Sequence, residues 1–161
     1  MQHNSRCSNS ERIHTWRYAQ RLRKEVEDLK ALCKHVCTIE SDEMVCIQVP
    51  SLKIVFTIFK NGHRCSTYPF FAPEVSWHGR DYFHTLRKVF SHFDFHSHAA
   101  SLVLATDSKC HFCDSTIQKW RSTSRLRNVI YDIWSVLSLQ QKYYEIVWAL
   151  KIVHYFNLQV S

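Results

Sequence analysis

Glycine and proline are scarce in this chain, which has two glycines and three prolines in 161 residues. Glycine supplies the backbone freedom on which glycine-rich phosphate loops depend. We therefore do not expect such a loop, and nucleotide binding through one is disfavoured.

Long apolar runs are also missing. The most apolar stretch, Tyr143 to Val153, is interrupted by Glu145 and Lys151, and a bilayer span needs about 20 apolar residues. The polar start has no apolar secretion segment, and the seven cysteines are odd in number and irregularly spaced. These absences predict a protein without a membrane span, located in the cytoplasm or the nucleus with its cysteines reduced.

The composition is that of a folded domain. Hydrophobic residues make up 45% of the chain and charged residues 22%, and the length suits one domain. We expect a flexible N-terminus over residues 1–9 and a single domain over residues 10–161. The net charge of +7 is spread along the chain without a dense basic block, so no nucleic-acid partner is expected.

The first half of the chain predicts one helix followed by strands. Ser8 and Glu11 fit a capping box, and apolar residues then recur at helical spacing as far as Cys33, which predicts a helix over 10–33. Segments 36–49 and 52–59 are rich in β-branched residues and predict two or three antiparallel strands. Asn61-Gly62 is typical of the turn after them.

The second half predicts a rigid segment, a strand and more helices. The prolines at 69 and 73 exclude a helix, so 68–73 should be extended and lead into a strand over 74–77. A short helix is predicted over 82–90, and two C-terminal helices over 125–137 and 143–153, with Trp134 and Trp148 in the core. The fold class is therefore α+β, with three or four antiparallel strands between the opening helix and the C-terminal helices.

Three segments resemble the ubiquitin-conjugating-enzyme (UBC-like) family. Arg21 to Leu29 resembles its basic opening helix. Tyr68 to Val75, Tyr-Pro-Phe-Phe-Ala-Pro-Glu-Val, is similar to its Tyr-Pro-Phe-x-x-Pro-x-Val segment. Lys119-Trp120, followed by Leu126 to Leu137, resembles its conserved tryptophan and the helix after the active site. The resemblance implies a UBC-like domain with an N-terminal helix, an antiparallel meander sheet and C-terminal helices.

The same resemblance locates diverged catalytic positions. The family's His-Pro-Asn motif is best matched by His92-Phe93-Asp94, whose aspartate would oppose the negative charge of an oxyanion. The family's nucleophile lies eight residues before the tryptophan, where this chain has Phe112. Cys113 is then the candidate nucleophile and Cys110 the alternative, with His92 and Asp94 as the diverged motif. This pattern favours a pseudoenzyme.

A zinc site is the competing interpretation of the cysteines. Cys110 and Cys113 form one Cys-x-x-Cys pair, and His92, His96 and His98 lie upstream. Because a second cysteine pair is missing, we expect no metal and no cofactor.

Family resemblance also implies partner-binding residues. The loops at Phe70 and at Trp120-Arg121 correspond to the surface that meets ubiquitin ligases, and the basic face of the opening helix corresponds to the surface that meets the activating enzyme. The candidates are Arg17, Arg21, Lys24, Phe70, Phe71, Trp120 and Arg121. The alternatives are that the two phenylalanines fill the core and that the basic residues form a solvated helix face.

The leading functional hypothesis is a non-catalytic binding or adaptor module in a ubiquitin or ubiquitin-like pathway or a larger assembly. Ubiquitin, a ubiquitin-activating enzyme and a ubiquitin ligase are the implied protein partners. The Trp120-Arg121 pair is also similar to inactive family members that serve as adaptors in vesicle transport. Two alternatives remain open: an active enzyme that forms a thioester on Cys113, and an RWD-type scaffold domain.

Overall fold

The computed structural model describes residues 9–60, 68–105 and 109–160, and within these ranges the side chains of residues 18 to 159. Nearly all of the predicted flexible N-terminus and the predicted Asn61-Gly62 turn lie outside the described residues. The opening helix is confirmed as α1, Asn9–Leu32. Among the described helices, none has a stretch long and apolar enough to cross a bilayer.

A five-stranded antiparallel sheet follows α1, in the order β1-β2-β3-β4-β5. Its strands are β1 Cys37–Glu40, β2 Met44–Val49, β3 Ile54–Phe59, β4 Glu74–Trp77 and β5 Arg80–Asp81, with a short 3-10 turn, Pro50–Leu52, between β2 and β3. The antiparallel α+β prediction is confirmed. The two-residue β5 takes the sheet beyond the predicted three or four strands.

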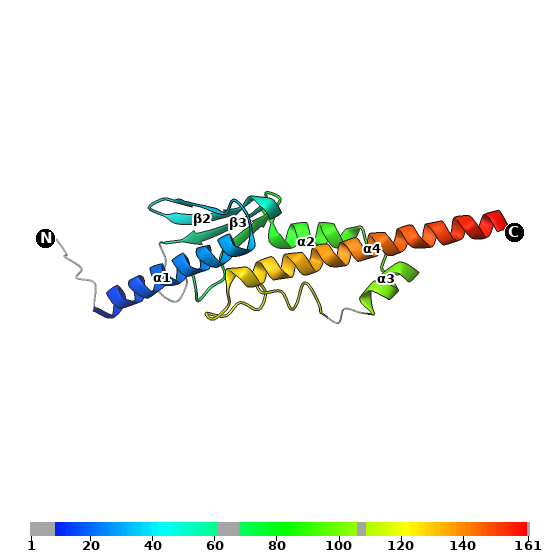
Figure 1. The fold of residues 1–161 in the computed structure, drawn as a ribbon. Coiled ribbons are helices and arrows are strands. Elements are labelled where there is room, and N and C mark those ends of the chain that lie inside the picture. Colours follow the sequence, from blue (N-terminus) through cyan, green and yellow to red (C-terminus); the bar gives the residue numbers. More distant parts are fainter. Residues whose placement is uncertain (1–8, 61–67, 106–108, 161) are drawn as a thin grey trace.

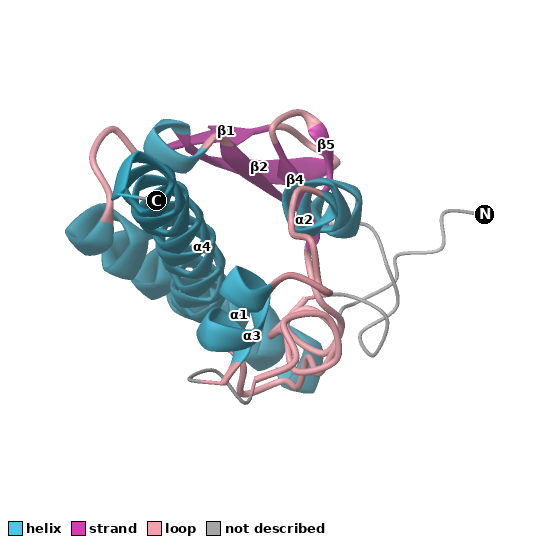
Figure 2. Cartoon of the chain, turned by 90° about the vertical axis from the view of Figure 1, so that its right-hand side faces the viewer, coloured by secondary structure: helices cyan, strands magenta, loops and turns pink. Residues whose placement is uncertain are grey.

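Alternation along β2, β3 and β4 gives the sheet one buried face. The inward side chains belong to the hydrophobic core: Val45, Ile47, Val49, Ile54, Phe56, Ile58, Val75 and Trp77. The period of two in a strand is the reason that these positions share one face. Figure 2 shows the sheet as one layer, with α1 and α4 in the layer next to it.

The β4–β5 connection is a tight turn of His78 and Gly79. Both residues have positive φ, 55° and 72°, as in the hairpin turn that matches the twist of antiparallel strands. The turn leads directly into α2, Tyr82–Ser91, which confirms the predicted short helix. Asp81 caps α2, because its carboxylate accepts hydrogen bonds from the backbone N–H groups of Phe83 and His84.

Two elements differ from the prediction in the middle of the chain. Residues 68–71 form a turn instead of an extended segment, with a cis Tyr68–Pro69 peptide bond. An additional helix, α3 His98–Leu104, begins after Ser97, whose hydroxyl accepts a hydrogen bond from the Ala100 N–H. The serine cap is the sequence signal for this helix.

The C-terminal region is a single helix, α4 Leu126–Val160, of 35 residues. The two predicted C-terminal helices are therefore wrong as separate elements. The residues between them, Ser138 to Lys142, contain no glycine or proline that would end a helix. Trp134 and Trp148 are also not core residues, because they are 37% and 66% exposed.

Candidate functional site

The three segments that carry the family resemblance meet in space. The Trp120 indole N–H donates a hydrogen bond to the Pro69 carbonyl at 2.7 Å. The Trp120 ring lies 5.8 Å from the Tyr68 ring, centroid to centroid. The Tyr-Pro turn and the tryptophan loop, far apart in sequence, thus pack against each other.

Arg21 joins α1 to this cluster. Its guanidinium donates hydrogen bonds to the carbonyls of Ser122 and Ser124, the latter at 2.6 Å. It also lies 5.5 Å from the centroid of the Tyr68 ring, within cation–π range. Because the Arg21 side chain makes these contacts within the chain, it holds the Trp120 loop in place. We name the set Arg21, Tyr68, Pro69 and Trp120 the aromatic clamp.

Beside the clamp, Glu25 supports the start of α4. Its Oε1 accepts a hydrogen bond from the Leu126 N–H at 3.1 Å, and its side chain is 1% exposed. Burial raises the pKa of Glu25, while the Leu126 N–H and nearby arginines act in the opposite direction. The carboxyl group therefore satisfies a backbone N–H at the N-terminus of α4, where the helix dipole favours negative charge.

The remaining predicted partner-binding residues lie on or outside the clamp. Phe70 and Phe71 are 44% and 58% exposed, so the alternative that both fill the core is wrong. Arg121 and Lys24 are also exposed. The side chain of Arg17 lies outside the described part of the chain.

Cys110 and Cys113 lie in one tight turn with both thiols exposed. The Asp114 N–H donates to the Cys110 carbonyl at 2.9 Å, and the Cys113 N–H donates to Cys110 Sγ at 3.3 Å. The Asp114 carboxylate accepts from the Cys110 N–H at 3.1 Å and from Lys119 Nζ at 2.5 Å. We name residues 110–114 the cysteine turn.

These contacts separate the two thiols chemically. Hydrogen bonds from the Cys113 N–H and thiol lower the pKa of Cys110. The hydrogen bond to Cys110, and then the negative charge of that sulfur, raise the pKa of Cys113. Cys110, the alternative nucleophile from the sequence, is thus the better thiolate of the pair.

The diverged motif contacts a different part of the chain. Phe93 is buried and stacks on Tyr143 at 4.4 Å between centroids, and the Asp94 N–H donates to the Tyr143 hydroxyl at 3.0 Å. The Asp94 carboxylate accepts from the His96 N–H at 3.1 Å. Within the described residues, no hydrogen bond joins His92 or Asp94 to either cysteine.

Phe112, which the family resemblance would place at the position of the nucleophile, packs on the Phe90 ring at 5.4 Å between centroids. Its ring is therefore part of the packing between α2 and the cysteine turn. In the described part of the chain, no group of three or more histidine, cysteine or acidic side chains is placed to hold a metal ion.

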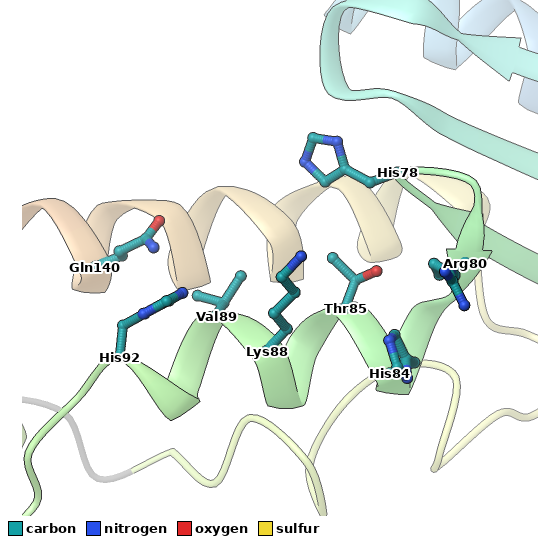
Figure 3. Close-up of a pocket in the computed structure, with 8 residues that line it drawn as sticks. All are labelled: His78, Arg80, His84, Thr85, Lys88, Val89, His92 and Gln140. Carbon is teal, nitrogen blue, oxygen red and sulfur yellow. The ribbon is translucent and has the colours of Figure 1, made fainter.

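A basic cleft lies between α2, α4 and the β4–β5 turn (Figure 3). Its volume is about 460 Å³, and its lining residues are His78, Arg80, His84, Thr85, Lys88, Val89, His92 and Gln140. In Figure 3 the Lys88 side chain points from α2 toward the His78 ring. His92 thus lines this cleft, which neither cysteine lines.

Sequence reasoning missed the basic cleft, although the chain contains a signal for it. His84, Lys88 and the C-cap residue His92 recur every four residues, the spacing that aligns side chains along one face of a helix, and Arg80 precedes the helix on β5. His78 and Gln140 reach the same cleft from other elements, and no local pattern could have assigned them to it.

Comparisons with known proteins return no match. No family model, no curated protein and no solved structure is similar enough to this chain to be counted as a relative.

Proposed function

We propose that this protein is a non-catalytic binding or adaptor module of the ubiquitin-conjugating type, which acts in a ubiquitin or ubiquitin-like pathway or a larger assembly. Its docking element is the C-terminal part of α4, residues 144–158, which we name the α4 extension. The partner is a protein that offers an apolar groove.

The pattern of burial along α4 is the observation that carries the proposal. Up to Tyr143, α4 has a buried face at helical spacing: Leu126, Val129, Ile130, Ile133, Val136, Leu139 and Tyr143. Among the described side chains from 144 to 159, none is buried. In Figure 1 the C-terminal end of α4 lies beyond the other described elements.

Apolar composition nevertheless continues through the α4 extension. Its exposed large hydrophobic residues are Tyr144, Trp148, Leu150, Ile152, Val153, Tyr155, Phe156 and Leu158. Only Glu145 and Lys151 carry full charges there. A helix that is apolar on all sides is normally buried, and large exposed apolar patches mark interaction surfaces. Aromatic residues are the usual anchors of protein interfaces, and a helix in an apolar groove is a common docking mode.

The geometry around the cysteine turn favours binding over catalysis. Acyl transfer needs preorganised donors beside the nucleophile to stabilise the oxyanion. Asp114 lies next to Cys113 in sequence, and its carboxylate is held within the turn by Lys119 and the Cys110 N–H. A carboxylate so close to the thiols opposes further negative charge.

A second candidate function is thioester chemistry on one of the two thiols. The lowered pKa of Cys110 and the exposure of both sulfurs favour it. Cys113 remains the cysteine nearest to the position that the family resemblance gives to the nucleophile, which Phe112 occupies, and Cys110 is the cysteine whose pKa the turn lowers.

The two candidates are separated by a charging reaction with activating enzyme, ATP and ubiquitin, analysed on a non-reducing gel. The binding proposal expects no reducible conjugate. Cys110→Ser and Cys113→Ser proteins serve as matched controls. A conjugate that is absent from one of these variants would establish the enzyme and identify its nucleophile.

Docking through the α4 extension is tested by site-specific photocrosslinking of the full chain at position 148. We expect defined adducts between the chain and its partner protein. Excess unlabelled wild-type chain should compete for the partner and reduce these adducts. A Trp148→Glu/Phe156→Glu chain should not compete, because charges on the apolar surface oppose its burial. Equal competition by both chains would show that the α4 extension is not the docking element.

A further inference from the structure

The basic cleft has no internal source of negative charge. None of its eight lining residues is aspartate or glutamate, whereas five of them are histidine, lysine or arginine. Asp81 lies next to Arg80 in sequence, but its carboxylate accepts the N–H groups at the start of α2 and does not line the cleft. The cleft is therefore a region of positive potential, which attracts an anion.

The two permanent cations of the cleft are not neutralised by the fold. Within the described part of the chain, Arg80 and Lys88 form no ion pair or hydrogen bond through their side chains. By contrast, Lys60 and Lys119 pair with Glu40 and Asp114 at 2.6 and 2.5 Å. The charges of Arg80 and Lys88 thus remain available to a ligand.

This arrangement does not serve stability. Like charges that line one cleft repel each other, as those of Arg80 and Lys88 do. Arg80 also lies at the positive end of the α2 dipole, where a cation is disfavoured. A bound anion would remove both unfavourable terms.

Two of the residues that line the cleft, His78 and Thr85, are held by contacts within the chain. The His78 ring stacks on Trp77, at 6.0 Å between centroids and 20° between planes. The left-handed turn at His78 and Gly79 fixes the direction of that ring. Thr85 is buried and donates its hydroxyl to the Trp77 carbonyl at 2.6 Å, which ties α2 to β4. Preorganised donors lower the entropic cost of binding.

We propose that the basic cleft binds a small soluble molecule that carries a diphosphate or two phosphate groups. Lys88 and Arg80 supply the charge, the imidazoles and the Gln140 amide supply further N–H donors, and Val89 supplies an apolar wall. The volume of about 460 Å³ lies within the range of small-molecule sites. This site is independent of the α4 extension and of the proposed docking function.

The test is isothermal titration of the full chain with pyrophosphate at constant ionic strength. Saturable binding at one site per chain is expected, with orthophosphate weaker because it engages fewer donors. Lys88→Glu should weaken binding about tenfold or more, the loss expected when a charge-assisted contact is replaced by repulsion. Arg87→Glu is the matched control: it makes the same change of charge on α2, and Arg87 is exposed and does not line the cleft.

The proposal holds if Lys88→Glu weakens binding while Arg87→Glu changes it by about twofold or less, as expected for a screened surface charge. A second variant, His92→Asn, tests the cleft without reversing any charge, and it should also weaken binding. Equal loss with Lys88→Glu and Arg87→Glu would reduce the effect to net charge and overturn the site. Absence of saturable binding at millimolar pyrophosphate would do the same. Displacement of pyrophosphate by vesicles whose lipid carries two headgroup phosphates would overturn the assignment to a soluble ligand.

Discussion

At the residue scale, the two thiols of the cysteine turn are neighbours with opposite tendencies. Both are exposed, yet the Cys113 N–H and thiol stabilise the Cys110 thiolate, and the pKa of Cys113 is raised in return. Lys119 holds Asp114 at 2.5 Å and so fixes the turn that creates the difference. Local hydrogen bonds, and not exposure, therefore determine which of the two thiols has the lower pKa.

We predict that Cys110 reacts with iodoacetamide several times faster than Cys113 at neutral pH. The reason is its larger thiolate fraction, since the thiolate is the nucleophile. Peptide mapping by mass spectrometry after short labelling measures both rates in one sample. Cys37, an exposed cysteine on β1, provides the reference rate. Faster labelling of Cys113 than of Cys110 would contradict the assignment.

Glu25 predicts a pH dependence of stability. Its pKa is raised in the folded state, so between the ordinary carboxyl value and the raised one the folded chain binds more protons than the unfolded chain. The free energy of unfolding must then fall as pH rises through that window, just above the ordinary carboxyl pKa of 4.5.

A Glu25→Gln variant should lose this slope while it keeps an acceptor for the Leu126 N–H. Urea unfolding at several pH values between about 4 and 7 measures the effect, because the ordinary carboxyl pKa lies at the lower end of that range. Glu27→Gln is the matched control, since Glu27 is exposed on the same helix. The same slope in wild type and Glu25→Gln would assign the pH dependence to another group.

At the element scale, the aromatic clamp joins three segments that are distant in sequence. The Trp120 indole donates a hydrogen bond to the Pro69 carbonyl. Arg21 of α1 donates hydrogen bonds to the carbonyls of Ser122 and Ser124. Trp120→Phe removes the indole donor, so the Pro69 carbonyl loses the hydrogen bond from residue 120. We expect it to lower the free energy of unfolding by about 1 to 3 kcal/mol, the range for a lost hydrogen bond together with lost packing.

The measurement is denaturant unfolding of Trp120→Phe beside wild type, followed by circular dichroism. Trp148→Phe is the control, because Trp148 is 66% exposed and should change stability by less than about 0.5 kcal/mol. A larger loss for Trp148→Phe than for Trp120→Phe would mean that the clamp does not hold these segments together.

The two parts of α4 should differ in local stability. Residues up to Tyr143 are anchored by buried side chains, and Ile146 and Val147 still pack against the core. Among the described side chains from 148 to 159 all are exposed, so this part of the α4 extension depends on its own backbone hydrogen bonds. We predict that backbone amides after residue 147 exchange with solvent much faster than those between 130 and 143. Hydrogen exchange followed by mass spectrometry measures this, and addition of a partner that covers the α4 extension should slow it. Uniform protection along α4 in the isolated chain would contradict this prediction.

At the scale of the whole molecule, the alternating strands and the opening helix could be predicted from the sequence, because their patterns are local. The strand Glu74–Trp77 could be predicted because the prolines before it exclude a helix. The single α4 could not be found in the same way. Two apolar faces at different angles suggested two helices, and the pattern cannot tell an apolar face that is buried from one that is not. Trp148 was assigned to the core for that reason.

The candidate sites show the same division between local and distant information. Cys110 and Cys113 were recognised as a pair from their spacing, and the structure places them in one turn. Their relation to His92 was inferred from alignment, but His92 lines the basic cleft instead. That cleft depends on the β4–β5 turn and on Gln140 of α4. No short segment of the sequence predicts that these elements lie close together.

The continuity of α4 has a geometric consequence. Each residue of an α-helix turns the chain by about 100° and advances it by about 1.5 Å. The direction in which Trp148 and Phe156 project is therefore fixed relative to Leu126 and the domain by the number of residues between them. One alanine inserted after Glu145 would rotate every later side chain by about 100°, whereas seven alanines would nearly restore the direction and displace the end by about 10 Å. The length of α4 thus sets both the direction and the distance of these side chains from the domain. A partner that contacts both the α4 extension and the domain would distinguish the two insertions.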